Sequence, residues 1–226
     1  MVEASTSTPD RAAIQAELLQ LAQTHLDNFE NYPRIHEEAD KEYYVHLLKG
    51  EGGSTSTTVS KYRADGLGVK HFEWLTANNI KMAGKVNDII TPTELEIEEG
   101  GHQIMYIHIK TPMIMSNRSQ ILCRYIIKSE DGSEFTVISS NKGNEELRKK
   151  YAAKIGKDVL ASTDINYLHT KAFKKDDGTE GVYLTQISRT DPNGSIPDMF
   201  KNKMVEKQKK GLGKLVETVR ANYDGQ

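Results

Sequence analysis

Arg124 is the residue whose type and position most clearly suggest chemistry. It lies between Leu122 and Ile126, and in a strand these three side chains would share one face because successive side chains alternate. A buried guanidinium is unfavourable unless it is paired and hydrogen-bonded, so it is rarely placed by accident. Either Arg124 is a polar anchor inside a cavity, for a ligand headgroup, a hydroxyl or an acidic side chain, or its face points outward and the charge is solvated.

The motifs of common enzymes are absent from the sequence. The seven histidines are scattered without the spacing of a metal site, and there is no Gly-x-Ser-x-Gly motif. Gly211-Leu212-Gly213 lacks the preceding strand and the third glycine of a nucleotide-binding loop. The acidic residues between positions 88 and 99 are typical of a solvated edge. We therefore expect no catalytic residue, no metal and no cofactor.

Bulk composition restricts the remaining classes of function. A chain of 226 residues with a net charge of −2 predicts one domain with a substantial core and no nucleic-acid partner. The only cysteine, Cys123, excludes an internal disulfide and fits a reducing compartment. No apolar run approaches the ~20 residues that span a bilayer, and the polar residues 1–8 do not resemble a signal peptide. We expect a cytoplasmic domain over residues 1–226, with residues 1–9 flexible.

The expected order of elements is typical of an α+β protein. Apolar residues recur at helical spacing between Ile14 and Phe29, and Thr8-Pro9-Asp10 is a helix start, so a helix is predicted over 10–31. Other helices are predicted over 68–78, onward to 87, and over 144–155, and strands over 43–49, 57–63, 95–98, 103–109, 119–127, 134–139, 164–173 and 182–188. This order predicts a curved antiparallel sheet with its helices on one face. Because aromatic residues are only 7% of the chain, we expect a ligand cavity between the sheet and the last helix.

The last helix is predicted over residues 198–223, after a Pro192-Asn193-Gly194 turn and with Pro197 at its start. Its apolar stripe, which by default is core packing, consists of Met199, Phe200, Met204, Leu212, Leu215, Val216, Val219 and Tyr223. Two features favour a lid instead. Gly211 and Gly213 each weaken a helix by ~1 kcal/mol relative to alanine. Seven basic residues against three acidic ones would also suit an anionic membrane surface.

Two motifs carry a resemblance to a known family. The first is Lys110-Thr111-Pro112-Met113-Ile114-Met115-Ser116-Asn117-Arg118 with the following strand to Arg124, and the second is Gly194-Ser195-Ile196-Pro197 with Asn202. They resemble the steroidogenic-acute-regulatory-related lipid transfer (START) domain, and within it members like phosphatidylcholine transfer protein. The resemblance covers about residues 57–226. It implies a helix-grip fold, in which a curved nine-stranded antiparallel sheet wraps a long C-terminal helix over a hydrophobic tunnel that holds one lipid.

The resemblance also implies site residues. The lipid-binding candidates are Arg118, Arg124, Tyr106, His108, Leu122, Met113, Met115, Gln186, Met199, Phe200 and Met204. The candidates for the gate and for membrane contact are Ile114, Gly211, Gly213, Lys207 and Lys210. The family counterpart of Arg124 commonly faces an acid on the neighbouring strand; here no acid is present, so its partner is His108, Tyr106 or the ligand itself. Arg118 is expected chiefly to tie loop to sheet, and the apolar loop tip 113–115 is either a gate or core packing.

One departure from the family limits what can be inferred about the lipid. The family's Arg-x-x-Trp-Asp motif reads Gly84-Lys85-Val86-Asn87-Asp88, so the arginine that meets the phosphate in phosphatidylcholine transfer protein is missing and that specificity does not carry over. The prediction is a monomeric, non-enzymatic carrier of one phospholipid or sterol that contacts anionic membranes transiently. The alternatives are a lipid-sensing interaction module without transfer activity and, third, a related-fold enzyme such as a cyclase or hydrolase.

Overall fold

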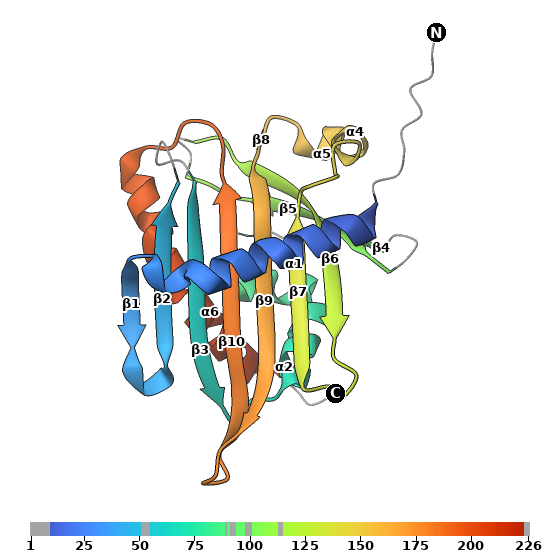
Figure 1. The fold of residues 1–226 in the computed structure, drawn as a ribbon. Helices are drawn as coiled ribbons and strands as arrows, with labels where there is room; N and C mark the ends of the chain where they lie inside the picture. Colours follow the sequence, from blue (N-terminus) through green and yellow to red (C-terminus); the bar gives the residue numbers. More distant parts are fainter. Residues whose placement is uncertain are drawn as a thin grey trace.

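One antiparallel sheet forms the centre of the molecule (Figure 1). The computed structural model describes residues 10–50, 55–88, 90, 94–97, 101–112 and 115–223. Within these residues the strands are β1 (Arg34–Glu38), β2 (Tyr43–Lys49), β3 (Ser56–Asp65), β4 (Glu94–Ile97), β5 (Gln103–Ile109), β6 (Arg118–Lys128), β7 (Glu134–Ser140), β8 (Val159–Leu160), β9 (Ser162–Lys174) and β10 (Glu180–Asp191). They are ordered β1-β2-β3-β10-β9-β7-β6-β5-β4, and only the short β8 pairs in parallel, with β6.

Helices cover both faces of this sheet (Figure 1). The helical segments are α1 (Arg11–Asn28), η1 (Phe29–Asn31), η2 (Ala39–Lys41), α2 (Val69–Ala77), α3 (Asn79–Val86), α4 (Leu147–Lys150), α5 (Ala152–Ile155) and α6 (Asp198–Asn222). We call the face that packs against α2 and α6 the inner face, and the face that α1 crosses the outer face. Asp10 caps α1, because its carboxylate accepts a hydrogen bond from the Ala13 amide at 3.0 Å.

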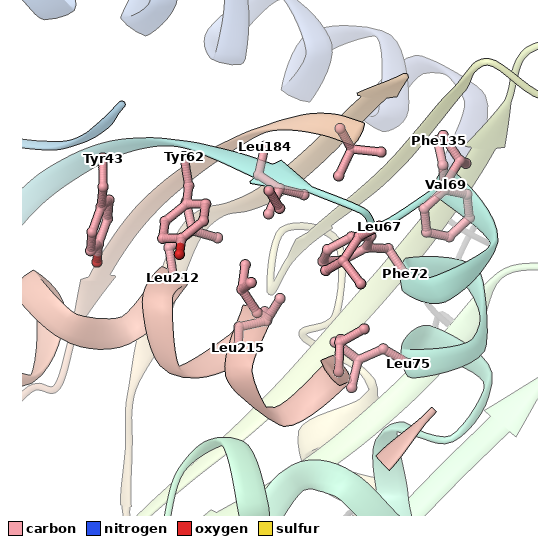
Figure 2. Close-up of a cluster of buried hydrophobic side chains, with 14 of the residues drawn as sticks. Tyr43, Tyr62, Leu67, Val69, Phe72, Leu75, Phe135, Leu184, Leu212 and Leu215 are labelled. Carbon is pink, nitrogen blue, oxygen red and sulfur yellow. The ribbon is translucent and has the colours of Figure 1, made fainter. Parts of the chain in front are cut away.

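The inner core joins the second half of α6 to α2 and the sheet. In Figure 2, Leu212 and Leu215 of α6 point toward the strand that carries Tyr62, and Leu75 of α2 lies beside them. Leu212 is fully buried, whereas Met199, in the first turn of the same helix, is 59% exposed. The predicted apolar stripe is therefore core packing only from Leu212 onward.

The outer core lies under α1 and the short helices α4 and α5. Leu18 and Ala22 of α1 pack against Ile138 and Ile165, which point out of the sheet on the side opposite α6. Four of the strands thus contribute alternate residues to two separate cores. Such alternation is what buries both faces of one sheet.

The α+β class and the curved antiparallel sheet with its long C-terminal helix are confirmed, but three expectations were wrong. The helices are not confined to one face, because α1 covers the other. Strand β1 was missed because its charged sequence shows no apolar alternation, which is common at a sheet edge. The predicted helix over 144–155 is two single turns that meet at Tyr151. The predicted flexibility of residues 1–9 lies outside the described residues.

The contact of α1 with the sheet makes the stability of the protein depend on pH. His25 of α1 is 6% exposed, and its Nδ1 lies 3.0 Å from the Tyr32 hydroxyl. Burial, together with the charge of Arg189, lowers the pKa of His25. The unfolded chain, in which the pKa is about 6.5, then binds a proton that the folded chain does not bind. Stability is therefore lost as the pH falls below that value.

We expect the free energy of unfolding, measured by urea denaturation, to fall between about pH 7.5 and pH 5.5. Replacement His25→Gln should make this fall smaller. A smaller dependence of stability on pH should remain, because burial also lowers the pKa of His169, as it does that of His25. An equally steep pH dependence in His25→Gln would show that this histidine is not responsible.

Candidate functional site

A cavity of about 750 Å³ lies between the inner face of the sheet and helices α2, α3 and α6. Its apolar lining comes mainly from these helices and from β5: Leu75, Met82, Ala83, Val86, Ile90, Met105, Ile107, Ile109, Val137, Leu168 and Leu215. Its polar lining from the sheet consists of Gln120, Arg124, Ser139, Asn166, Gln186 and Ser188. The helical side also contributes polar and charged residues, among them Asn79, Asp88 and Lys214. The cavity therefore combines apolar lining with a polar floor on the sheet, a combination that suits an amphipathic ligand.

The polar floor follows from the strand register. Arg124 lies opposite Gln103 on one side and Ser139 on the other, Ser139 lies opposite Asn166, and Asn166 lies opposite Ser188. We call these five residues, which come from five neighbouring strands, the polar row. All of them except Gln103 line the cavity. Directly opposed side chains in a sheet are near enough to act together on one ligand group.

Arg124 is the charged residue at the centre of this floor. Its side chain lines the cavity and is only 9% exposed, so the charge does not point outward into solvent. Burial lowers its pKa to about 10, which leaves the guanidinium charged at neutral pH. Its one hydrogen bond is a long one, 3.4 Å from Nη1 to Gln103 Oε1, and its buried Nε has no partner among the described residues. No described carboxylate lies within ion-pair distance of it.

Tyr106 and His108 do not reach Arg124, and this part of the prediction is corrected. Both lie on the outer face, because the cavity receives the odd-numbered residues of β5. The Tyr106 hydroxyl donates to the carbonyl of Lys154 at 3.0 Å, and His108 Nδ1 lies 2.7 Å from Asp158 Oδ2. Adjacent residues of a strand point to opposite faces, so they could not both have lined the cavity.

Arg118 is buried outside the cavity and holds two loops together. Its guanidinium donates to the carbonyls of Pro192 and Asn193, at 3.3 and 3.1 Å, and to that of Ser116. These bonds connect the segment before β6 to the turn between β10 and α6. The loop-tying role expected for Arg118 agrees with these contacts, whereas a contact with a ligand in the cavity does not.

Helix α6 contributes to the cavity at its middle. Gly211, Lys207 and Lys210 line the cavity, and Lys207 forms an ion pair of 3.1 Å with Asp88, just beyond α3. Gly213 lies instead over the ring of Tyr43, whose hydroxyl donates to the carbonyl of Lys209 at 2.5 Å. The backbone of α6 is thus held to the sheet just where the helix is rich in glycine.

The remaining candidate lipid-binding residues fall into two groups, those at or beside the cavity and those away from it. Gln186 lines the cavity, and Leu122 is buried beside Met105 on the same face. Leu122 does not itself line the cavity, and neither do the described candidates Met115, Met199, Phe200 and Met204. For the three on α6 the reason is that the first half of this helix extends beyond the inner core. Met113 and Ile114 lie outside the described residues.

Sequence reasoning missed the lining supplied by α2 and α3 and most of the polar row. Met82 and Val86 recur at a helical spacing of four, a signal that could have placed them on one face. Ser139, Asn166 and Ser188 are single polar residues in three different strands. Only the pairing register brings them together, and no local pattern carries it.

The described residues contain neither a candidate metal site nor a candidate membrane span. Among these residues no group of three or more His, Cys, Asp or Glu side chains could hold a metal ion. None of the described helices combines the length and apolarity needed to cross a membrane.

Comparison with known proteins finds similar structures but no similar sequences. No protein-family model and no curated protein matches the sequence significantly. Human STARD10 is similar with a TM-score of 0.66 and 14% identity, covering 96% of this chain and 82% of its own. Human StAR-related lipid transfer protein 5 has a TM-score of 0.62 and 11% identity over 92% and 98% of the two chains. A fragment of the STAR-related lipid transfer protein from Xanthomonas axonopodis has a TM-score of 0.59 and 19% sequence identity. The match covers 84% of this chain and 98% of that fragment.

These similarities show that the chain has the fold of START domains, the helix-grip fold. The sheet, the C-terminal helix and the cavity between them agree with that fold.

The two buried arginines should respond in opposite ways to replacement. Arg118→Met leaves three backbone carbonyls without their charged donor, and we expect it to lower the free energy of unfolding by about 2–4 kcal/mol. Arg124→Met removes a buried charge that has one long hydrogen bond. It should leave the stability of the ligand-free protein unchanged or raise it by up to about 4 kcal/mol. Urea denaturation of the two ligand-free variants measures both effects, and an equal loss in the two would contradict this contrast.

Proposed function

We propose that this protein binds one lipid in the cavity and carries it between membranes. The observation that supports this most directly is the cavity itself, about 750 Å³ with many apolar lining residues and one buried charge on its floor. Burying a methylene away from water is worth ~0.8 kcal/mol, so an acyl chain would remain in such a cavity rather than enter water. A non-enzymatic carrier needs no more chemistry than this.

A bilayer solvates an acyl chain about as well as the cavity does, so exchange requires only that the cavity open next to a membrane. The two halves of α6 suit that step. From Leu212 onward the helix is anchored in the inner core, whereas the part before it carries Met199 and Met204, which are 59% and 39% exposed. Gly211 and Gly213 separate these halves. In this proposal the first half is the lid and the glycines allow it to move.

The surface of the lid suits an anionic membrane. Lys203, Lys207 and Lys210 are exposed on the same half of α6 as the two methionines. Apolar and basic residues together favour binding to anionic lipid headgroups, with ~1 kcal/mol from each basic residue near the surface. We further propose that the protein acts as a monomer in the cytoplasm. We do not propose phosphatidylcholine as the cargo, because Gly84 replaces the arginine of that subgroup.

Native mass spectrometry of the full chain, after incubation with liposomes of mixed lipid composition, tests the proposal. We expect a 1:1 complex of protein and lipid, and transfer of that lipid to acceptor vesicles. Recovery of lipid-free protein under all compositions would contradict the carrier function. Stable loading without transfer would favour a lipid-sensing module.

Stiffening α6 should slow lipid exchange more than it changes equilibrium loading. Gly211→Ala introduces a methyl group that has no heavy atom within 4 Å, so it fits without strain. It strengthens the helix by ~1 kcal/mol, which would slow an opening that bends the helix there by about fivefold. The Gly211→Ala/Gly213→Ala double variant should be slower still, although the second methyl would lie 3.4 Å from the ring of Tyr43.

The matched control for this measurement is Thr24→Ala, which strengthens α1 on the outer face at an exposed site. It should leave the rate of transfer between vesicles unchanged. Equal rates in the wild type and the glycine variants would refute the lid, and equal slowing by Thr24→Ala would assign the effect to global stability.

A further inference from the structure

We propose that the ligand of this cavity is a single-chain amphiphile with an anionic head, a carboxylate or a phosphate, which binds Arg124. This inference rests on the proposed function, and it names the class of lipid. Three independent observations lead to it: the missing counter-charge of Arg124, the donors that surround it, and the size of the cavity.

The first observation is the missing counter-charge. Arg124 is nine-tenths buried, lines the cavity and has a single hydrogen bond, to the neutral amide of Gln103. A buried charge without an opposite charge is strongly unfavourable, so a binding partner of opposite charge relieves a large penalty. No described side chain supplies that charge. A neutral hydroxyl would leave the charge uncompensated, whereas a carboxylate or phosphate would neutralise it and accept two parallel hydrogen bonds from the guanidinium.

The second observation is the composition of the floor around Arg124. The polar row continues from Arg124 with Ser139 and Asn166, a hydroxyl and an amide that can donate to the remaining oxygens of an anion. At the mouth, Lys207 and Lys210 add positive charge to the lining, against Glu206 and Asp88. These groups favour a negatively charged head over a positively charged one, and they exclude an amine as the group that meets Arg124.

The third observation is the volume of the cavity. A methylene occupies about as much space as a water molecule, roughly 30 Å³, so 750 Å³ accommodates about 25 such groups. One long acyl chain with its head fits within this space. A diacyl phospholipid has about twice as many non-hydrogen atoms and would need a larger space, so the size of the cavity favours a single-chain lipid.

The experiment compares four probes with matched chains: palmitate, hexadecyl phosphate, hexadecanol and dipalmitoyl phosphatidic acid. Each is titrated into the delipidated full chain near neutral pH, and binding is followed by displacement of a fluorescent fatty acid and by native mass spectrometry. We expect palmitate or hexadecyl phosphate to bind about ten- to a hundredfold more tightly than hexadecanol, as a charge-assisted hydrogen-bonded pair predicts. The tighter of the two anions identifies the head. The diacyl lipid should bind more weakly than either.

Three variants test the role of Arg124. Arg124→Gln removes the charge and should abolish the preference for the anions while leaving hexadecanol binding within about twofold. Gln103→Glu keeps Arg124 but places a carboxylate at its existing contact, so it should abolish the same preference without disturbing the cavity. Arg124→Lys keeps the positive charge but lacks the planar guanidinium with its paired donors, so it should retain part of the preference for anions. Circular dichroism and denaturation verify that each variant is folded.

Equal affinities for palmitate, hexadecyl phosphate and hexadecanol in the wild type would overturn the inference and leave the lipid-carrier function intact. A preference that survives in both Arg124→Gln and Gln103→Glu would also overturn it. Tight 1:1 binding of dipalmitoyl phosphatidic acid would overturn the single-chain part. If no probe and no vesicle lipid binds, the proposed function itself fails.

Discussion

The strict alternation of side chains along the strands is the constraint on which the rest of this structure depends. Because both faces of the sheet are covered, each strand must supply one core with its odd-numbered residues and the other with its even-numbered residues. In β5 this sends Met105 to the cavity and Tyr106 to the core under α1. A slip of one residue would exchange the two sets, so register and site are specified together. The polar floor exists only because five strands keep this register.

The two covers of the sheet differ in how completely they are packed. On the outer face α1 seals the sheet, with Leu18 and Ala22 almost fully buried. On the inner face α6 is packed only beyond Gly211, and the rest of that face is left to the cavity. Protein interiors are normally close-packed, so an unfilled space costs stability. The well-packed outer core can offset that cost on the inner face. The cavity is thus a local departure from packing that the remainder of the fold can tolerate.

The sequence alone was sufficient for much of the fold, because strands such as Tyr43–Lys49 and Gln103–Ile109 carry strong local patterns. It also located Arg124, since a charge in an apolar strand is a local anomaly. Contacts that depend on strand register or on the orientation of a helix face could not be predicted from the sequence. Tyr106 was assigned to the cavity although it lies one residue from Met105, and Met199 was predicted to bind lipid although it does not line the cavity. Both errors concern orientation, which tertiary packing decides.

If the protein carries a lipid as proposed, the uncompensated charge of Arg124 would determine how selective its binding and release are. The acyl chain of a lipid gains little from moving between a bilayer and this cavity, because both are apolar. The free energy that distinguishes one lipid from another must then come from its head, and Arg124 is the charged group on the cavity floor. Without a ligand this guanidinium is buried and poorly hydrogen-bonded, so the empty protein is the less stable state. At an anionic membrane, opening of the cavity would hydrate the charge and lower that penalty, so the same residue that retains the lipid would also ease its exchange there.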